Sequence, residues 1–344
     1  GSLTLTAMGQ GETLQAEGRF TYRAPALDIE RFALNNGPNT IDARVALNTE
    51  TRATRASIEA ALPDLARLGR VAQLALAGSA ELNADVSGTP EDLDLRARGG
   101  AREVAAFGVS LAELALNADI NGPPAAPRGT VTLTVSALDA DTLKLDTVSL
   151  DADLRGDAAD FALAAAGRAQ DYDVRLDVDG AARRDGADVA IAVDTLDGAV
   201  DDVTLALAQP LRAAWRGGGL MLEPVALRIA EGTLRAEGVY GPERADLTLT
   251  LDALPLALAE QFGGPSLRGA LSLDAALQGP MPAPTATANA RLAGFRLPEA
   301  PGTLDLVAQA RVADGRAALD ANLTTGETFA IDIDSALPMR FSLQ

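Results

Sequence analysis

The side chains of this chain that could do chemistry are carboxylates, because the 344 residues include 48 Asp and Glu but no His and no Cys. Two carboxylates flanking a glycosidic bond can act as acid and base, and clusters of oxygen ligands suit Ca²⁺. Close pairs of aspartates recur along the chain: Asp139 and Asp141, Asp151 and Asp153, Asp177 and Asp179, Asp201 and Asp202. These acids alternate with apolar residues, and no EF-hand loop or glycine-rich calcium repeat accompanies them. We therefore interpret them as the solvated face of strands.

The missing residue types exclude several function classes. Without His or Cys there is no imidazole base, no thiol nucleophile and no zinc site of the usual kind. No phosphate-binding glycine loop precedes a helix. The net charge of −19 repels nucleic-acid phosphate. The sequence therefore predicts no enzyme, no catalytic residue, no metal, no cofactor and no nucleic-acid partner.

Apolar and polar residues alternate with a period of two through most of the chain. In residues 130–136, for example, Val131, Leu133 and Val135 are separated by threonines. Side chains point to opposite faces of a strand in turn, so about 25 such segments predict half-buried strands of an antiparallel sheet. Gly, Pro and Asn clusters separate them as turns.

Two segments have helical spacing instead, near residues 62–70 and 254–263. Two interpretations stay open for them: caps that cover apolar surface at the end of the sheet, or a gate that lifts from a groove. Residues 210–215 are expected to form a further short turn. We interpret Trp215, which stands between Arg212 and Arg216, as a corner residue covering the end of the sheet rather than as a contact site.

An internal repeat argues for one extended architecture. The Ala-Leu-Pro at residues 61–63 precedes a glycine-bounded strand at 78–88, and the Ala-Leu-Pro at 253–255 precedes a similar strand at 269–279. No flexible linker separates them, which favours a quasi-linear fold. The chain also begins Gly1-Ser2 rather than with Met. We therefore expect residues 1–344 to be a single elongated, repetitive fragment of a longer protein.

The composition favours a sheet whose apolar face stays accessible. Aromatic residues make up only 3% of the chain, so a bulky core would have to be built from Leu, Val and Ala. A closed barrel, a solenoid and a row of sandwiches all suit this pattern less well. The predicted fold is all-β: an elongated antiparallel sheet folded lengthwise into a U-shaped groove, with a few short helices.

The order of the motifs in residues 220–227, 232–238, 246–251, 254–257 and 267–275 resembles that of the TamB family. TamB is the inner-membrane-anchored subunit of the translocation and assembly module and is related to the AsmA-like bridge-like lipid-transfer proteins. The resemblance implies a periplasmic β-taco groove that carries phospholipid between the two membranes of a diderm bacterium. It also implies an outer-membrane partner of the Omp85 class (TamA-like), bound through parts outside this fragment. Membrane contact would occur only through an anchor that the fragment lacks.

Two classes of function therefore remain open. The first is a conduit for phospholipid acyl chains. The second is a structural protein, either a scaffold or chaperone for outer-membrane β-proteins such as autotransporters or a secreted β-rich adhesin. In the conduit, the groove is lined by apolar residues from the inward positions: Leu82, Val86, Val131, Leu133, Val135, Leu150, Ile191, Val193, Leu205, Leu207, Leu247, Leu249, Leu251, Leu271, Leu273, Leu277 and Ile331.

Overall fold

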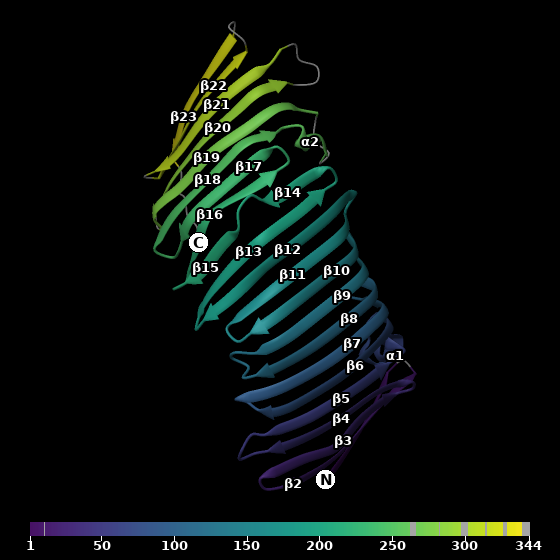
Figure 1. Cartoon of the computed structure of the whole chain (residues 1–344). Helices are drawn as coiled ribbons and strands as arrows, with labels where there is room; N and C mark the ends of the chain where they lie inside the picture. The colour runs from purple at the N-terminus through teal and green to yellow at the C-terminus, as the bar shows by residue number, and fades with distance from the viewer. Residues whose placement is uncertain are drawn as a thin grey trace. The chain divides into compact units, whose positions relative to one another are not determined.

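The computed structural model describes residues 1–9, 11–261, 266–281, 283–296, 302–313, 315–325 and 329–338. These residues form 23 strands and two helices, and the strands pair antiparallel with neighbours close in sequence (Figure 1). The all-β antiparallel class predicted from the sequence is confirmed. The chain divides into two units, Gly1–Asp179 and Gly180–Gln344, and each is described by itself.

Unit 1 is a meander in which each of the first ten strands pairs with the next along the chain. One short helix, α1 (Leu65–Ala72), follows the fifth strand. The strands are β1 (Ser2–Gly9), β2 (Glu12–Arg23), β3 (Ala26–Asn36), β4 (Asn39–Asn48), β5 (Thr54–Leu62), β6 (Leu76–Thr89), β7 (Asp92–Ala106), β8 (Val109–Gly122), β9 (Arg128–Ala140), β10 (Leu143–Arg155) and β11 (Ala158–Ala169), while β12 (Tyr172–Asp185) includes the boundary between the units.

Unit 2 continues the meander with one interruption. Its elements are β13 (Asp188–Val200), β14 (Val203–Leu207), β15 (Leu211–Arg216), β16 (Gly219–Ile229), β17 (Gly232–Tyr240), β18 (Arg244–Pro255), α2 (Leu258–Gln261), β19 (Arg268–Pro280), β20 (Thr285–Arg296), β21 (Leu304–Ala313), β22 (Arg316–Thr325) and β23 (Phe329–Pro338). Strands β14 and β15 both pair with β13 and with β16. They are thus two halves of one strand, broken at residues 208–210.

The expected short turn at residues 210–215 is wrong, because most of it belongs to β15. Pro210 removes a backbone donor and interrupts the ladder, but the flanking strands β13 and β16 hold the residues after it extended. The two helices lie in the segments with helical spacing. Of the segment 254–263, residues 262 and 263 lie outside the described residues.

A line of irregular residues crosses the strands of unit 1. Gly78, Glu103 and Ala137 have φ of 96°, 51° and 48°, and they occupy corresponding register positions in β6, β7 and β9. The pairing shifts beside this line, between Ala77 and Ser79 and between Leu145 and Thr147. Bulges bend a strand and increase its twist, so bulges aligned across neighbouring strands crease the sheet along a line perpendicular to the strands.

The repeat detected in the sequence places this irregularity in both units. Gly78 and Gly269, 191 residues apart, have φ of 96° and 115°, and Gly88 and Gly279 have φ of 116° and 109°. Only glycine adopts such φ values without strain, so these glycines fix where the backbone departs from regular pairing. Unit 2 shows pairing shifts next to Gly269 and Gly294.

Very little of the described chain is buried. The buried apolar residues are small: Ala16, Ala33, Ala60, Val135, Val203, Ala214, Ala226 and Ala245. The accessible surface is 21082 Å². Two separate globular proteins of half this mass would together expose about 16,000 Å². The sheet therefore lacks the packed interior that normally covers an apolar face.

We expect Gly78→Ala to destabilise the crease of unit 1. A Cβ at Gly78 would lie 2.4 Å from the carbonyl oxygen of Glu103, and φ is positive. The cost should be about 2 kcal/mol of local unfolding free energy. Hydrogen exchange of peptides covering β6 and β7 measures it. Gly99→Ala is the matched control on β7, because its Cβ would meet atoms no nearer than 3.4 Å. Equal hydrogen-exchange rates in the Gly78→Ala and Gly99→Ala variants would contradict the role of Gly78 in the crease.

Candidate functional site

Apolar side chains of unit 1 form continuous rows that run across the strands. One row consists of residues directly opposite one another from β2 to β11: Ala16, Leu34, Ile41, Ala60, Leu82, Gly99, Leu116, Leu133, Leu150 and Leu163. Residues two positions away along each strand form parallel rows, for example Ala84, Ala97, Ala118, Val131 and Ala152. Residues two apart on a strand share a face. We call this surface the apolar face of unit 1.

Six of the predicted groove residues lie on the apolar face of unit 1. Leu82, Leu133 and Leu150 belong to the row just described. Val131 and Val135 occupy the rows on either side of it, and Val86 lies one row beyond that of Val131. The structure therefore brings these six residues onto one surface, although up to 68 residues separate them in the sequence.

The other eleven predicted residues lie on one face of unit 2. One row there contains Leu207, Leu227, Leu234, Leu251, Leu273, Ala290, Ala308, Ala321 and Ile333, and another contains Leu254, Leu271, Leu292, Leu306, Leu323 and Ile331. Ile191, Leu247 and Leu277 share a third row, and Leu249 lies between the first and third. Val193 and Leu205 share this face with Ile191 and Leu207. We call it the apolar face of unit 2.

The seventeen residues predicted to line the groove are mostly intermediate in exposure, neither buried in a core nor fully exposed to solvent. Val135 is the only one of the seventeen that is buried, while Ile191 and Ile331 are 42% and 40% exposed. The remaining residues are half-buried. Neighbouring strands thus shield the edges of these side chains, and their tips stay accessible to a ligand.

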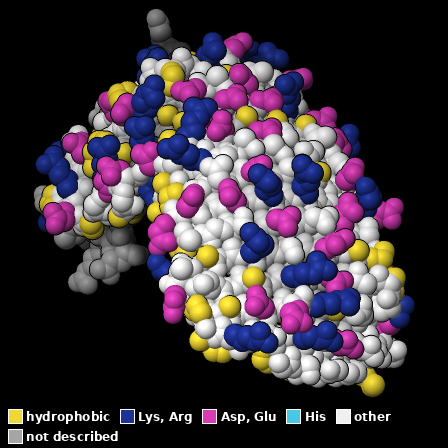
Figure 2. Space-filling view, turned by 60° about the horizontal axis from the view of Figure 1, so that its bottom comes forward, with side chains coloured by type: hydrophobic (Ala, Val, Ile, Leu, Met, Phe, Trp, Pro, Cys, Tyr) yellow, Lys and Arg dark blue, Asp and Glu magenta, His cyan; other side chains and the backbone are white. Residues whose placement is uncertain are grey.

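The opposite face of each unit is polar. In unit 1, Asn83, Arg98, Asn117, Thr132 and Asp151 lie opposite one another, and in unit 2 Thr248 pairs with Glu237. Exposed cross-strand ion pairs such as Arg31–Asp42 add little stability but keep the surface hydrated. Figure 2 shows a face on which basic and acidic side chains are interspersed. Of the carboxylate pairs of the sequence, Asp151 and Asp153 lie on the polar face of β10, whereas Asp201 and Asp202 lie in the turn between β13 and β14.

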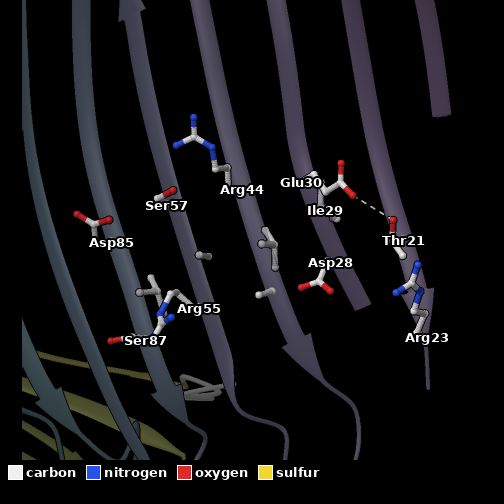
Figure 3. Close-up of a pocket in the computed structure, with 14 residues that line it drawn as sticks. Thr21, Arg23, Asp28, Ile29, Glu30, Arg44, Arg55, Ser57, Asp85 and Ser87 are labelled. Atoms are coloured by element: carbon white, nitrogen blue, oxygen red, sulfur yellow. Dashed lines mark hydrogen bonds between the residues drawn. The ribbon is translucent and has the colours of Figure 1, made fainter. Parts of the chain in front are cut away.

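A hollow of about 730 Å³ lies over β2–β6 (Figure 3). Polar residues dominate its lining, with Arg23, Arg44 and Arg55 balanced by Asp28, Glu30 and Asp85. Thr21 donates a hydrogen bond to Glu30. Among the described residues no buried side-chain polar atom lacks a hydrogen-bond partner, so no buried polar group points unpartnered into the hollow.

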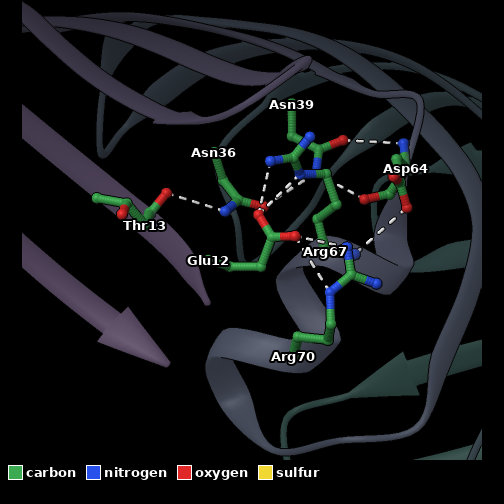
Figure 4. Close-up of polar contacts among 7 residues, drawn as sticks. All are labelled: Glu12, Thr13, Asn36, Asn39, Asp64, Arg67 and Arg70. Atoms are coloured by element: carbon green, nitrogen blue, oxygen red, sulfur yellow. Dashed lines mark hydrogen bonds and ion pairs between the residues drawn. The ribbon is translucent and has the colours of Figure 1, made fainter. Parts of the chain in front are cut away.

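Helix α1 is tied to the ends of several strands by a polar cluster that was not predicted from the sequence (Figure 4). Glu12, whose side chain is only 12% exposed, forms ion pairs of 2.6 Å with both Arg67 and Arg70. The buried Asn39 side chain accepts from the Asp64 backbone N–H at 2.9 Å and donates to its carbonyl at 2.6 Å. The helix therefore lies against β1, β2 and β6, well beyond the strand that it follows.

The carboxylate of Glu12 is held ionised by this geometry. Hydrogen bonds from Arg70 and then Arg67 lower the pKa of Glu12 below its ordinary value, and their charges add to the effect. Each guanidinium donates two hydrogen bonds to the carboxylate. Such charge-assisted bidentate pairs are stronger than neutral hydrogen bonds and fix the orientation of both partners.

The geometry defines a class: an antiparallel β protein with one accessible apolar face and one charged face in each unit. Within the described residues, neither helix has the length and apolar character needed to cross a membrane. The family model described as TamB, N-terminal domain, matches residues 2–189. The chain belongs to the TamB family, which confirms the resemblance drawn from its motifs. No curated protein and no solved structure matches the chain.

Sequence reasoning found the apolar faces but not the α1 cluster. Glu12 is 55 and 58 residues from its two arginines, so no local spacing links them. Asn36 and Asn39 resemble ordinary turn residues, yet both are completely buried. The one available signal was the acid at Asp64, which caps α1 by accepting from the Arg67 backbone N–H.

The ion pairs of Glu12 with Arg67 and Arg70 predict that the docking of α1 against the strands depends on pH. Because the pKa of Glu12 is lowered in the folded state, its contribution is complete above the ordinary carboxyl pKa and is lost as pH falls through the lowered value. Hydrogen-exchange protection factors for α1 should therefore fall in acid. Glu12→Gln should lower protection at neutral pH and remove the additional loss at low pH. An unchanged acid dependence in this variant would exclude Glu12 as its source.

Proposed function

We propose that this chain carries phospholipid between the inner and outer membranes of a diderm bacterium, with the acyl chains against its apolar faces. The observation that carries the proposal is the unbroken row from Ala16 to Leu163. It crosses ten neighbouring strands without one charged or polar side chain. Membership of the TamB family supports the same function.

The energetics explain why such a surface is needed. Exposing an acyl chain to water costs roughly 0.8 kcal/mol per methylene, or on the order of 12 kcal/mol for a 16-carbon chain. A continuous apolar floor removes most of this cost along the route. Because the rows repeat without a polar anchor, neighbouring positions are similar in energy, which favours sliding over trapping. The charged opposite face keeps the sheet hydrated.

We further propose a periplasmic location, in a parent protein anchored in the inner membrane with an outer-membrane partner of the Omp85 class. Family membership supports this placement.

A second candidate is a scaffold for outer-membrane β-proteins. Among the described strands, β1 pairs with β2 alone, and its Leu3 and Leu5 are exposed. An extended client strand could add to such an edge by backbone hydrogen bonds. In that case the edge strand, rather than the apolar rows, would contact the client.

Photo-crosslinking from adjacent residues on one strand separates these candidates. A photoreactive residue at Leu133 should capture phospholipid, whereas one at Thr132 should not, because the two side chains lie on opposite faces of β9. Leu249 and Thr248 provide the same comparison in unit 2. Mass spectrometry of the adducts identifies the lipid. Phospholipid recovered from both faces, or from neither, would overturn the conduit.

Charges placed on the apolar faces should block transfer. A charged side chain facing hydrocarbon costs roughly 2.5–3.5 kcal/mol, so Leu205→Asp and Leu249→Arg should each slow phospholipid transfer between donor and acceptor vesicles at least tenfold. Thr132→Asp and Thr248→Asp, on the polar faces, are the matched controls. Equal transfer by all four variants, with unchanged circular dichroism, would refute the proposal.

A further inference from the structure

Three large side chains lie directly opposite one another at the margin of the apolar face of unit 2. Trp215 on β15 pairs with Leu220 on β16, which pairs with Tyr240 on β17. They are 49%, 38% and 37% exposed. A residue covering the end of a sheet would be more buried than Trp215 is. We call these three residues the lip.

The register places the lip on the same face as the apolar rows. Each lip residue is two positions along its strand from a member of the row that contains Ala213, Leu222, Gly238 and Leu247. Beyond Trp215 the chain turns back through Gly217 and Gly218 into β16. The lip therefore marks the end of the apolar face at this hairpin.

Trp and Tyr combine an apolar ring with a polar tip. Both are enriched where hydrocarbon meets lipid headgroups, because the ring packs on the chains and the tip stays hydrated. The indole N–H of Trp215 and the hydroxyl of Tyr240 have no hydrogen-bond partner among the described residues. Their polar tips are thus available to a ligand or to water.

The apolar face beyond the lip has the depth of an acyl chain. Along β18 it runs from Leu247 through Leu249 and Leu251 to Leu254. The seven steps from Leu247 to Leu254, at no more than about 3.3 Å each, span at most roughly 23 Å, because the strand is irregular after Leu251. One leaflet of a bilayer contributes about half of its 30 Å of hydrocarbon. An acyl chain that starts at the lip and follows the strands therefore ends on apolar residues.

We propose that the lip is a phospholipid subsite. The glycerol and ester region rests on Trp215, Leu220 and Tyr240, and the acyl chains lie along β16–β18 over Leu247 and Leu249. This inference rests on the proposed function and adds a defined depth and orientation for the lipid.

Trp215 is the only tryptophan of the chain, so its fluorescence reports on the lip directly. The protein is loaded with phosphatidylglycerol carrying bromine at carbons 6 and 7 or at carbons 11 and 12, and bound lipid is quantified by mass spectrometry. Because the ring lies near the ester end of the chains, the shallow bromines should quench Trp215 more strongly than the deep ones. Unbrominated lipid should shift its emission to shorter wavelength.

Two double variants calibrate the depth. In Trp215→Phe/Leu251→Trp the tryptophan lies further down the apolar face, so the deep bromines should quench it more strongly. In Trp215→Phe/Thr248→Trp it lies on the polar face, and neither lipid should quench it.

The outcomes separate this inference from the proposed function. Bound lipid that leaves Trp215 unquenched, or that quenches it more strongly with deep bromines, overturns the lip while the conduit stands. If no lipid binds to protein whose circular dichroism shows a folded β-sheet, both the lip and the conduit are overturned.

Discussion

The structure depends on the alternation of side chains in an antiparallel ladder, kept in register from one strand to the next. In unit 1 the residues of the row from Ala16 to Leu163 face apolar residues or Gly99 on the neighbouring strands, as Leu133 faces Leu116 and Leu150. A slip of one residue would move a whole strand's apolar set to the charged face. Register, rather than a packed core, therefore specifies which surface is apolar and which is hydrated.

A regular ladder alone would give a twisted ribbon, so the position of the bends must be encoded separately. Gly78 and Gly269 supply a backbone conformation that other residues adopt only with strain, and pairing shifts lie next to both. The departures from regularity repeat at the same interval as the sequence motif. The sequence repeat therefore specifies where the strands bend as well as which positions are apolar.

The sequence predicted what depends on local alternation and missed what depends on distant contacts. Leu133 and Thr132 were assigned to opposite faces because strand geometry alone separates them. The turn expected after Pro210 was wrong, because pairing with β13 and β16 overrides the local signal. Glu12 could not be matched to Arg67 from sequence, since the pairing of the four strands β2–β5 brings them together.

A uniform apolar floor leaves specificity to the places where the repeat is interrupted. Rows of Leu, Val and Ala differ little from one strand to the next, so they cannot fix the position of a bound chain or distinguish one headgroup from another. Distinctive chemistry occurs instead at margins: Trp215 and Tyr240 at a hairpin of unit 2, and the Glu12 cluster under α1 in unit 1. In a conduit built this way the apolar floor lowers the cost of movement, the lip orients the bound lipid, and the Glu12 cluster fixes the position of α1.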